Sequence, residues 1–93
     1  MERAQDLHRR GYLPEAALLY RELLQRSPRH AAAMNGLGIL CAQQGDKESA
    51  LEWIGKAVAL DSRSTAYLVN YGKALLQLGR VRHPDREAEV EPA

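Results

Sequence analysis

The chain has 93 residues, a formal net charge of +1 and no phenylalanine, and 45% of its residues are hydrophobic. This length suits one domain of modest stability, and a net charge so close to zero gives no reason to expect nucleic acid or an anionic membrane as a partner. The longest apolar runs are also far shorter than the roughly 18 residues that indicate a membrane span.

The first part of the chain predicts two helices joined by a tight turn. The first helix is expected over residues 2–10, and Gly11 follows it at a position suited to a helix end. The second is expected over residues 14–26, where Pro14 suits the first turn of a helix. Pro28 then separates this helical pair from the rest of the chain.

Three more helices are predicted, over residues 31–43, 47–60 and 65–78. In the third and fourth helices of the chain, apolar residues recur at helical spacing and form one stripe on each helix: Met34, Leu37, Leu40 and Cys41, then Ala50, Ile54, Ala57 and Val58. Between these two helices, Gly45 suits a positive φ, and Asp46 can cap the helix that follows.

The chain repeats itself at a fixed interval, here called the repeat period. The interval from Gly11 to Gly45 equals the interval from Gly45 to Gly79. The same shift pairs residues of similar size or polarity: Leu7 with Cys41 and Leu75, Leu37 with Tyr71, Gly38 with Gly72, Ala16 with Ala50, Tyr20 with Ile54, and Leu23 with Ala57. Such a sustained period is typical of repeat proteins, in which each unit packs on its neighbours.

These motifs resemble the tetratricopeptide repeat family, most completely in residues 31–64. That unit carries the family pattern at Leu37-Gly38, Gly45-Asp46, Ala50, Ile54 and Ala57. Mild departures are Met34 in place of Trp, Cys41 in place of Tyr and Ser62 in place of the closing Pro. The resemblance implies an all-α fold, with antiparallel helix-turn-helix repeats stacked as a short right-handed α-solenoid.

The repeat domain is expected to cover residues 1–80. It would hold a partial repeat over 1–30, a full repeat over 31–64 and the first helix of a third repeat over 65–79. In residues 81–93 Pro84 interrupts the pattern and the acids cluster. We expect this segment to be a disordered acidic tail, and a helical cap for the fifth helix is the alternative.

No constellation of residues in the sequence is placed for catalysis or metal binding, so we expect no enzyme activity, no cofactor and no metal. Cys41 lies on an apolar stripe and is interpreted as a small buried hydrophobe. As the single cysteine it excludes an internal disulfide and favours a reducing compartment. The N-terminus also lacks the apolar stretch of a signal peptide, so we expect a cytoplasmic protein.

The family resemblance implies a non-enzymatic module that binds a peptide or protein segment in a concave groove lined by the first helix of each repeat. By position, the lining residues would be Gln5, His8, Asn35, Ile39, Ala42, Val69, Asn70 and Lys73, with Arg9, Gln43 and Gln77 beside them. One subgroup of the family grips the carboxylate of chaperone tails with Lys, Asn and Arg. The residues at those positions of this chain argue against that ligand: Met1, Gln5, Gly36, Ala66 and Asn70.

Two further hypotheses concern the partners of the chain. The style of the sequence also resembles repeat segments that precede bacterial glycosyltransferase or sulfotransferase domains, which makes an accessory or detached module of such a system the alternative function. The fifth helix has no partner helix in a third repeat. We expect its open face to carry Tyr67, Tyr71, Ala74 and Leu78 and to form a homodimer, and the alternatives are a monomer covered by the tail and a fragment of a longer array.

Overall fold

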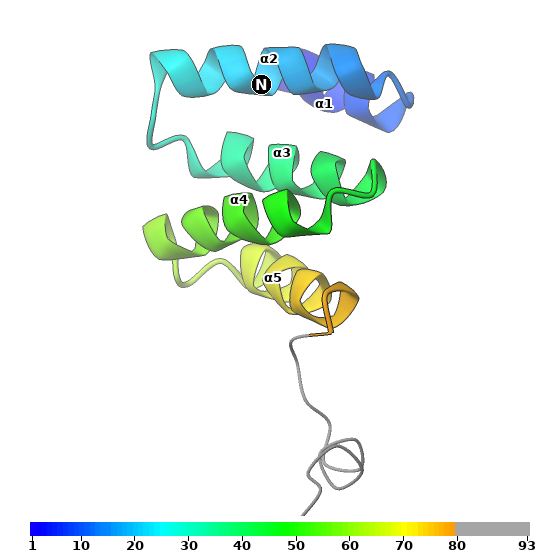
Figure 1. The fold of residues 1–93 in the computed structure, drawn as a ribbon. Coiled ribbons are helices and arrows are strands. Elements are labelled where there is room, and N and C mark those ends of the chain that lie inside the picture. The colour runs from blue at the N-terminus through cyan, green and yellow to red at the C-terminus, as the bar shows by residue number, and fades with distance from the viewer. Residues whose placement is uncertain (80–93) are drawn as a thin grey trace, which may run out of the picture.

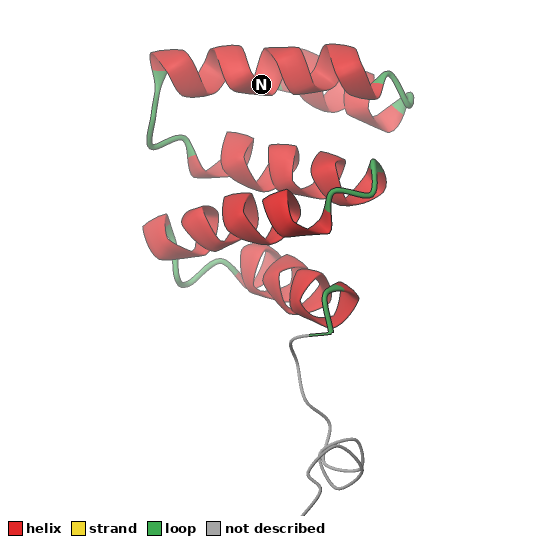
Figure 2. Cartoon of the chain, in the orientation of Figure 1, coloured by secondary structure: helices red, strands yellow, loops and turns green. Residues whose placement is uncertain are grey.

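The computed structural model describes residues 1–79, which form five α-helices and no strand (Figures 1 and 2). Helix α1 spans Glu2–Arg9, α2 spans Leu13–Arg26, α3 spans Ala31–Gln43, α4 spans Lys47–Leu60 and α5 spans Thr65–Gln77. The predicted bounds are confirmed to within one residue at each end. Residues 81–93, for which a tail was predicted, lie outside the described part.

Each helix packs mainly on the next one along the chain, which produces the layered stack seen in Figure 1. Helices α1 and α2 form one antiparallel pair, and α3 and α4 form a second, more extensive pair. Helix α5 packs on α4 and also touches α3. This is the all-α helical repeat solenoid that the repeat period predicts.

The turns explain why the chain folds back at regular intervals. Gly11, Gly45 and Gly79 have φ values of +88°, +89° and +70°, a conformation that costs other residues free energy. Asp46 then caps α4, because its Oδ1 accepts a hydrogen bond of 3.2 Å from the backbone N–H of Ser49. The capping role predicted for Asp46 is therefore confirmed.

The core is built from a few large side chains that pack among alanines and glycines. Tyr20, Leu37 and Leu40 are the largest fully buried side chains, and Ala16, Ala50 and Ala57 are 0% exposed. A Cβ added to Gly38 would lie 2.5 Å from Cγ1 of Ile54 and 3.1 Å from the backbone oxygen of Ala50. Small residues are thus required where α3 and α4 approach each other.

Helix α5 is oriented differently from the prediction. Of the four residues expected on its open face, Ala74 is only 3% exposed, and Tyr71 and Leu78 border a hollow shared with α4. Tyr71 also lies against Gly55, where an added Cβ would be 3.2 Å from the ring. The expected open face is therefore wrong, because this stripe packs on the preceding repeat. The exposed large side chains of α5 are Leu68, Val69 and Leu76.

None of the described helices combines the length and the apolar character that crossing a membrane requires.

Candidate functional site

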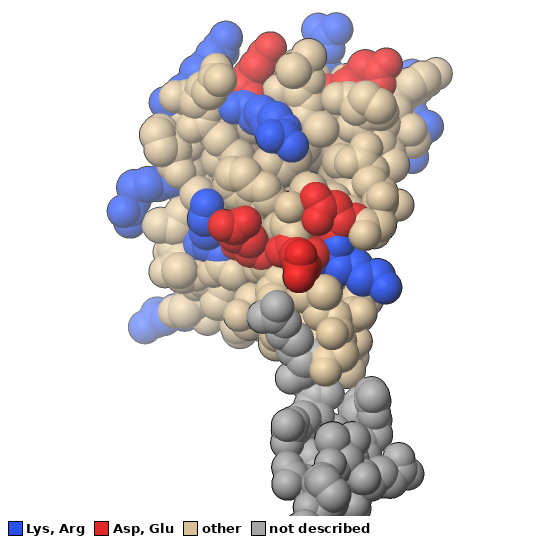
Figure 3. All heavy atoms as spheres, viewed as in Figure 1, with Lys and Arg blue, Asp and Glu red and all other residues tan. Residues whose placement is uncertain are grey.

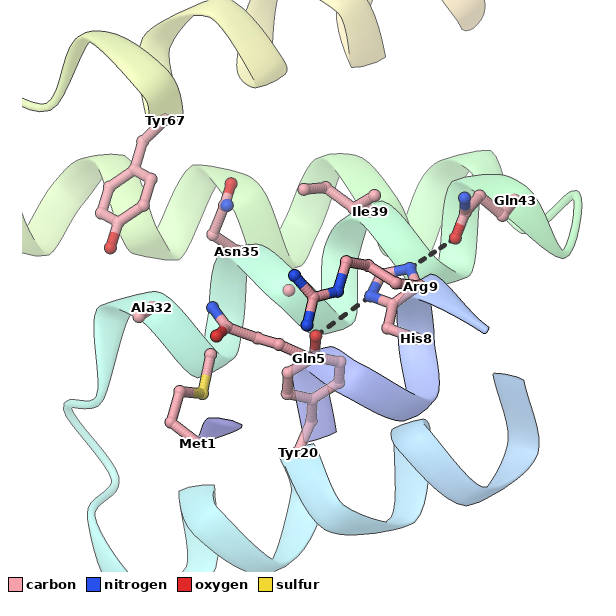
Figure 4. Close-up of a pocket in the computed structure, with 11 residues that line it drawn as sticks. Met1, Gln5, His8, Arg9, Tyr20, Ala32, Asn35, Ile39, Gln43 and Tyr67 are labelled. Carbon is pink, nitrogen blue, oxygen red and sulfur yellow. Dashed lines mark hydrogen bonds between the residues drawn. The ribbon is translucent and has the colours of Figure 1, made fainter. Parts of the chain in front are cut away.

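Two open hollows lie along the side of the stack to which α1, α3 and α5 contribute. The first has a volume of about 620 Å³ and takes most of its lining from α1 and α3, with Tyr67 of α5 at one end (Figure 4). The second has a volume of about 270 Å³ and lies between α3 and α5. Because Ile39 and Gln43 line both hollows, the two form one continuous groove.

Most of the predicted lining residues do border this groove. Gln5, His8, Asn35 and Ile39 line the first hollow, and Ile39, Ala42, Asn70 and Lys73 line the second. Val69 lines neither of them, and its side chain is 49% exposed on the outer side of α5. The structure therefore brings seven of the eight predicted residues to one groove and places Val69 elsewhere.

A hydrogen-bonded chain of side chains fixes one wall of the first hollow. Nδ1 of His8 lies 3.0 Å from the hydroxyl of Tyr20, and Nε2 of His8 bonds to Oε1 of Gln43. In the orientation that the structure gives the Gln43 amide, its oxygen accepts a hydrogen bond from Nε2 of His8, and Nδ1 then accepts one from the hydroxyl of Tyr20. Figure 4 shows that these hydrogen bonds join α1, α2 and α3 beside Arg9. The imidazole is therefore held in place, with both ring nitrogens engaged.

A second polar contact joins the two hollows across α3 and α5. Nδ2 of Asn70 donates a hydrogen bond of 3.1 Å to Oδ1 of Asn35. This bond uses one donor of Asn70 and one acceptor site of Asn35. The amide nitrogen of Asn35 and the amide oxygen of Asn70 retain their own capacity for hydrogen bonds. A row of such amides can pair with the N–H and C=O groups of an extended main chain.

The charged residues that line the groove are basic. Arg9 and Lys73 border the first and second hollows, and among the described residues no Asp or Glu lines either of them. In Figure 4 the Arg9 guanidinium reaches over the hollow toward Gln5 and Tyr20. Its ion pair with Asp6 is 3.6 Å long, and the two side chains are 78% and 45% exposed, so this pair binds Arg9 only weakly.

Acidic side chains gather on a different surface. Figure 3 shows them over α4, where Glu48 and Glu52 are exposed. Beside Glu52 on the same helix, Nζ of Lys56 lies 4.6 Å from the ring centre of Trp53. Trp53 is half-buried and packs against the core.

Seven residues that line the two hollows were not predicted to do so: Met1, Tyr20, Ala32, Gly36, Ile54, Tyr67 and Ala74. Tyr20 lies on α2, and the family pattern gives no lining role to second helices. Its ring reaches the hollow because Gly36 leaves room, since an added Cβ there would lie 2.6 Å from the ring. Tyr67 stands one repeat period after Ala33, which is buried. Because the alanine is small, it gives no sign that a larger side chain at the equivalent position would enter the groove.

Cys41 is buried, and its environment is unsuited to nucleophilic chemistry. Its side chain is 5% exposed, and the pKa of the thiol is raised by burial and by the negative charge of Asp46, against the opposing effect of Arg21. Across residues 1–79, no group of three His, Cys, Asp or Glu side chains is arranged to hold a metal ion.

We expect Cys41 to react with iodoacetamide near pH 8 far more slowly than free cysteine. A raised pKa leaves less thiolate at that pH, and burial blocks the approach of the reagent. Mass spectrometry of the native chain over time measures the rate, and the urea-unfolded chain is the control. Equal rates in the native and unfolded chains would contradict the buried placement.

Comparisons with known proteins add one finding. A family model described as tetratricopeptide repeat matches residues 1–65. A search of curated proteins finds no significant match for the chain.

Proposed function

Since this chain belongs to the tetratricopeptide repeat family, whose repeats generally mediate protein–protein interaction, we propose that it binds an extended segment of a partner protein in the groove along α1, α3 and α5. The family is typically a non-catalytic interaction module, and the proposed role of this chain is binding without catalysis. The accessory role beside a transferase draws no support from residues 1–79.

The observation that carries this proposal is the chemistry of the groove lining. Amide side chains from three helices border one groove: Gln5, Asn35, Gln43, Asn70 and Gln77. Amides supply both donors and acceptors, which suits the alternating polar groups of an extended main chain. Ile39 and Tyr67 add apolar surface for side chains of the bound segment.

The two cations favour a segment that carries acidic side chains. Arg9 and Lys73 belong to different hollows, so one extended segment that occupies the whole groove would meet both. Hydrogen bonds to a charged group contribute about 1.5–3 kcal/mol each, which is enough to decide between acidic and neutral segments.

Selection from a phage-displayed library of random peptides, followed by fluorescence polarisation, tests the proposal. We expect selected peptides to be rich in Asp or Glu, and to bind as well with an amidated C-terminus as with a free carboxylate. The double variant Arg9→Gln/Lys73→Gln should weaken binding at least about tenfold. Binding should also weaken as salt rises.

The matched control is Arg29→Gln/Arg63→Gln, which removes two exposed arginines from loops outside the groove. This variant has the same net charge as the groove variant, so it reports the effect of overall charge alone. Equal losses in the two double variants would count against binding in the groove. Peptides that lose affinity when their C-terminus is amidated would instead indicate carboxylate capture.

A further inference from the structure

The outer face of α5, made of Leu68, Val69, Gly72, Leu75 and Leu76, is apolar and open to solvent. Leu68, Val69 and Leu76 are 46%, 49% and 51% exposed. The opposite stripe of α5 is also apolar and packs on α3 and α4, and Lys73 is the single charged residue between Thr65 and Gln77. A helix with two opposite apolar sides is usually covered by other protein on both of them.

The chain itself contains a covered version of this face. Met34, Gly38 and Cys41 stand one repeat period before Leu68, Gly72 and Leu75. These three residues of α3 are buried, and Ile54 of α4 lies against Gly38. By contrast, a Cβ added to Gly72 would meet no atom of residues 1–79 within 4 Å. The outer face of α5 therefore has the form of a surface on which a helix packs closely, and α1–α4 leave it uncovered.

The segment that follows α5 does not repeat the sequence of α4. Pro84, Ala88 and Glu91 stand one repeat period after Ala50, Ile54 and Ala57. A proline replaces the first small residue, an alanine replaces the large side chain that lies on glycine, and a glutamate replaces the last alanine. Residues 81–93 thus lack the stripe that covers the equivalent face of α3.

The order of residues on the outer face is symmetric about Gly72. Leu68 and Leu76 lie at equal distances along the chain on either side of Gly72, and so do Val69 and Leu75. A two-fold axis through Gly72 would pair Leu68 of one antiparallel helix with Leu76 of its partner, and Val69 with Leu75. A self-complementary patch of this kind is what an isologous contact requires.

We propose that a second copy of this chain covers the outer face of α5, so that two α5 helices cross antiparallel at Gly72. The absence of a side chain at Gly72 allows the two backbones to approach closely, and the apolar side chains on each side become buried. Lys73 lines the second hollow of the groove, so the pairing does not set two lysines face to face. The binding groove remains a separate surface.

Cysteine cross-linking of the full chain tests the antiparallel arrangement. Under mild oxidation, Gly72→Cys is expected to form a disulfide with itself across the axis. Leu68→Cys and Leu76→Cys are expected to cross-link when they are mixed, and much less when each is alone. The wild-type chain is the control, because its buried Cys41 should not cross-link. Self-linking of Leu68→Cys and of Leu76→Cys, without a gain on mixing, would overturn the antiparallel register.

Light scattering after size exclusion, over a range of concentrations, tests the second copy itself. The wild-type chain is expected to dimerise, and Leu68→Glu and Leu76→Glu should each raise the dissociation constant more than about tenfold. Leu18→Glu is the matched control, because Leu18 is 60% exposed on α2, away from α5. Circular dichroism confirms that each variant is folded.

A wild-type chain that stays monomeric up to millimolar concentration would overturn the proposal, and a helix from a different protein or from a following segment would then be the occupant. Dimers that persist in both glutamate variants would place the contact on another surface and overturn it too. Neither result would count against the proposed peptide groove, because the groove variants and the α5 variants share no residue.

Discussion

Replacement of Tyr20 by alanine is expected to lower the free energy of unfolding by about 3–5 kcal/mol, a large fraction of the total for a domain of this size. Tyr20 is 1% exposed and is among the largest fully buried side chains of the described helices. Its ring fills the space beside Gly36, so its removal leaves a cavity between α2 and α3. Urea unfolding followed by circular dichroism measures the change.

The Tyr20→Phe variant separates the ring from the hydroxyl. It keeps the packing of the ring and removes the hydrogen bond to Nδ1 of His8, so the expected loss is about 1 kcal/mol. Burial raises the pKa of Tyr20, so the hydroxyl keeps its proton at neutral pH and donates it to His8. If Tyr20→Phe were as destabilising as Tyr20→Ala, the hydrogen bond and not the packing would dominate at this position.

Replacement of Ala50 by leucine is expected to lower the free energy of unfolding by about 1–3 kcal/mol through overpacking. Ala50 is 0% exposed and faces α3 at the point where Ile54 packs against Gly38, which has no side chain. The larger side chain would force α3 and α4 apart, and this pair makes the most extensive contact between helices in the stack. Thermal and urea unfolding report the loss.

The matched control for Ala50→Leu is Ala59→Leu, which makes the same change on an exposed position of the same helix. Helix propensity changes equally in both variants, so the difference between them isolates the packing term. The control is expected to stay within about 0.5 kcal/mol of the wild type. An unchanged melting temperature in Ala50→Leu would contradict the close approach of α3 and α4.

The positions of the helices could be predicted because the turns and the contacts repeat. Gly11, Gly45 and Gly79 mark the helix ends at a fixed period, and each adopts the positive φ that glycine tolerates. Ala50 and Ala57 mark the inner face of α4, because a close helix pair admits only small residues there. Local and repeating signals of this kind are visible in a single sequence.

The orientation of α5 could not be predicted in the same way. Tyr71 and Ala74 lie on one side and Leu68 and Leu76 on the other, and both sides are apolar. Hydrophobic periodicity identifies an inner face only when the opposite face is polar. The packing of α5 on α3 and α4 decides which of its two apolar sides faces inward. The spacing of apolar residues in the sequence does not reveal that packing.

The groove was partly predictable for a related reason. Ile39 and Lys73 stand one repeat period apart on first helices, so their place on the groove could be carried over from the family, although the same shift takes Asn35 to Val69, which lies outside it. The two hydrogen bonds of His8, to Tyr20 and to Gln43, could not be predicted. They join residues on three helices that are 12 and 35 positions apart in the sequence. Such contacts depend on how the helices are spaced and not on any motif.

The linear order of contacts in the stack has a consequence for how the protein opens. Because each helix depends mainly on its immediate neighbours, a fluctuation at one end can separate a terminal helix while the rest stays folded. Helix α3 touches α2, α4 and α5, so its amide hydrogens should exchange with solvent last. Exchange should be faster toward both ends, in α1 and in an uncovered α5, and a second copy would slow it in α5.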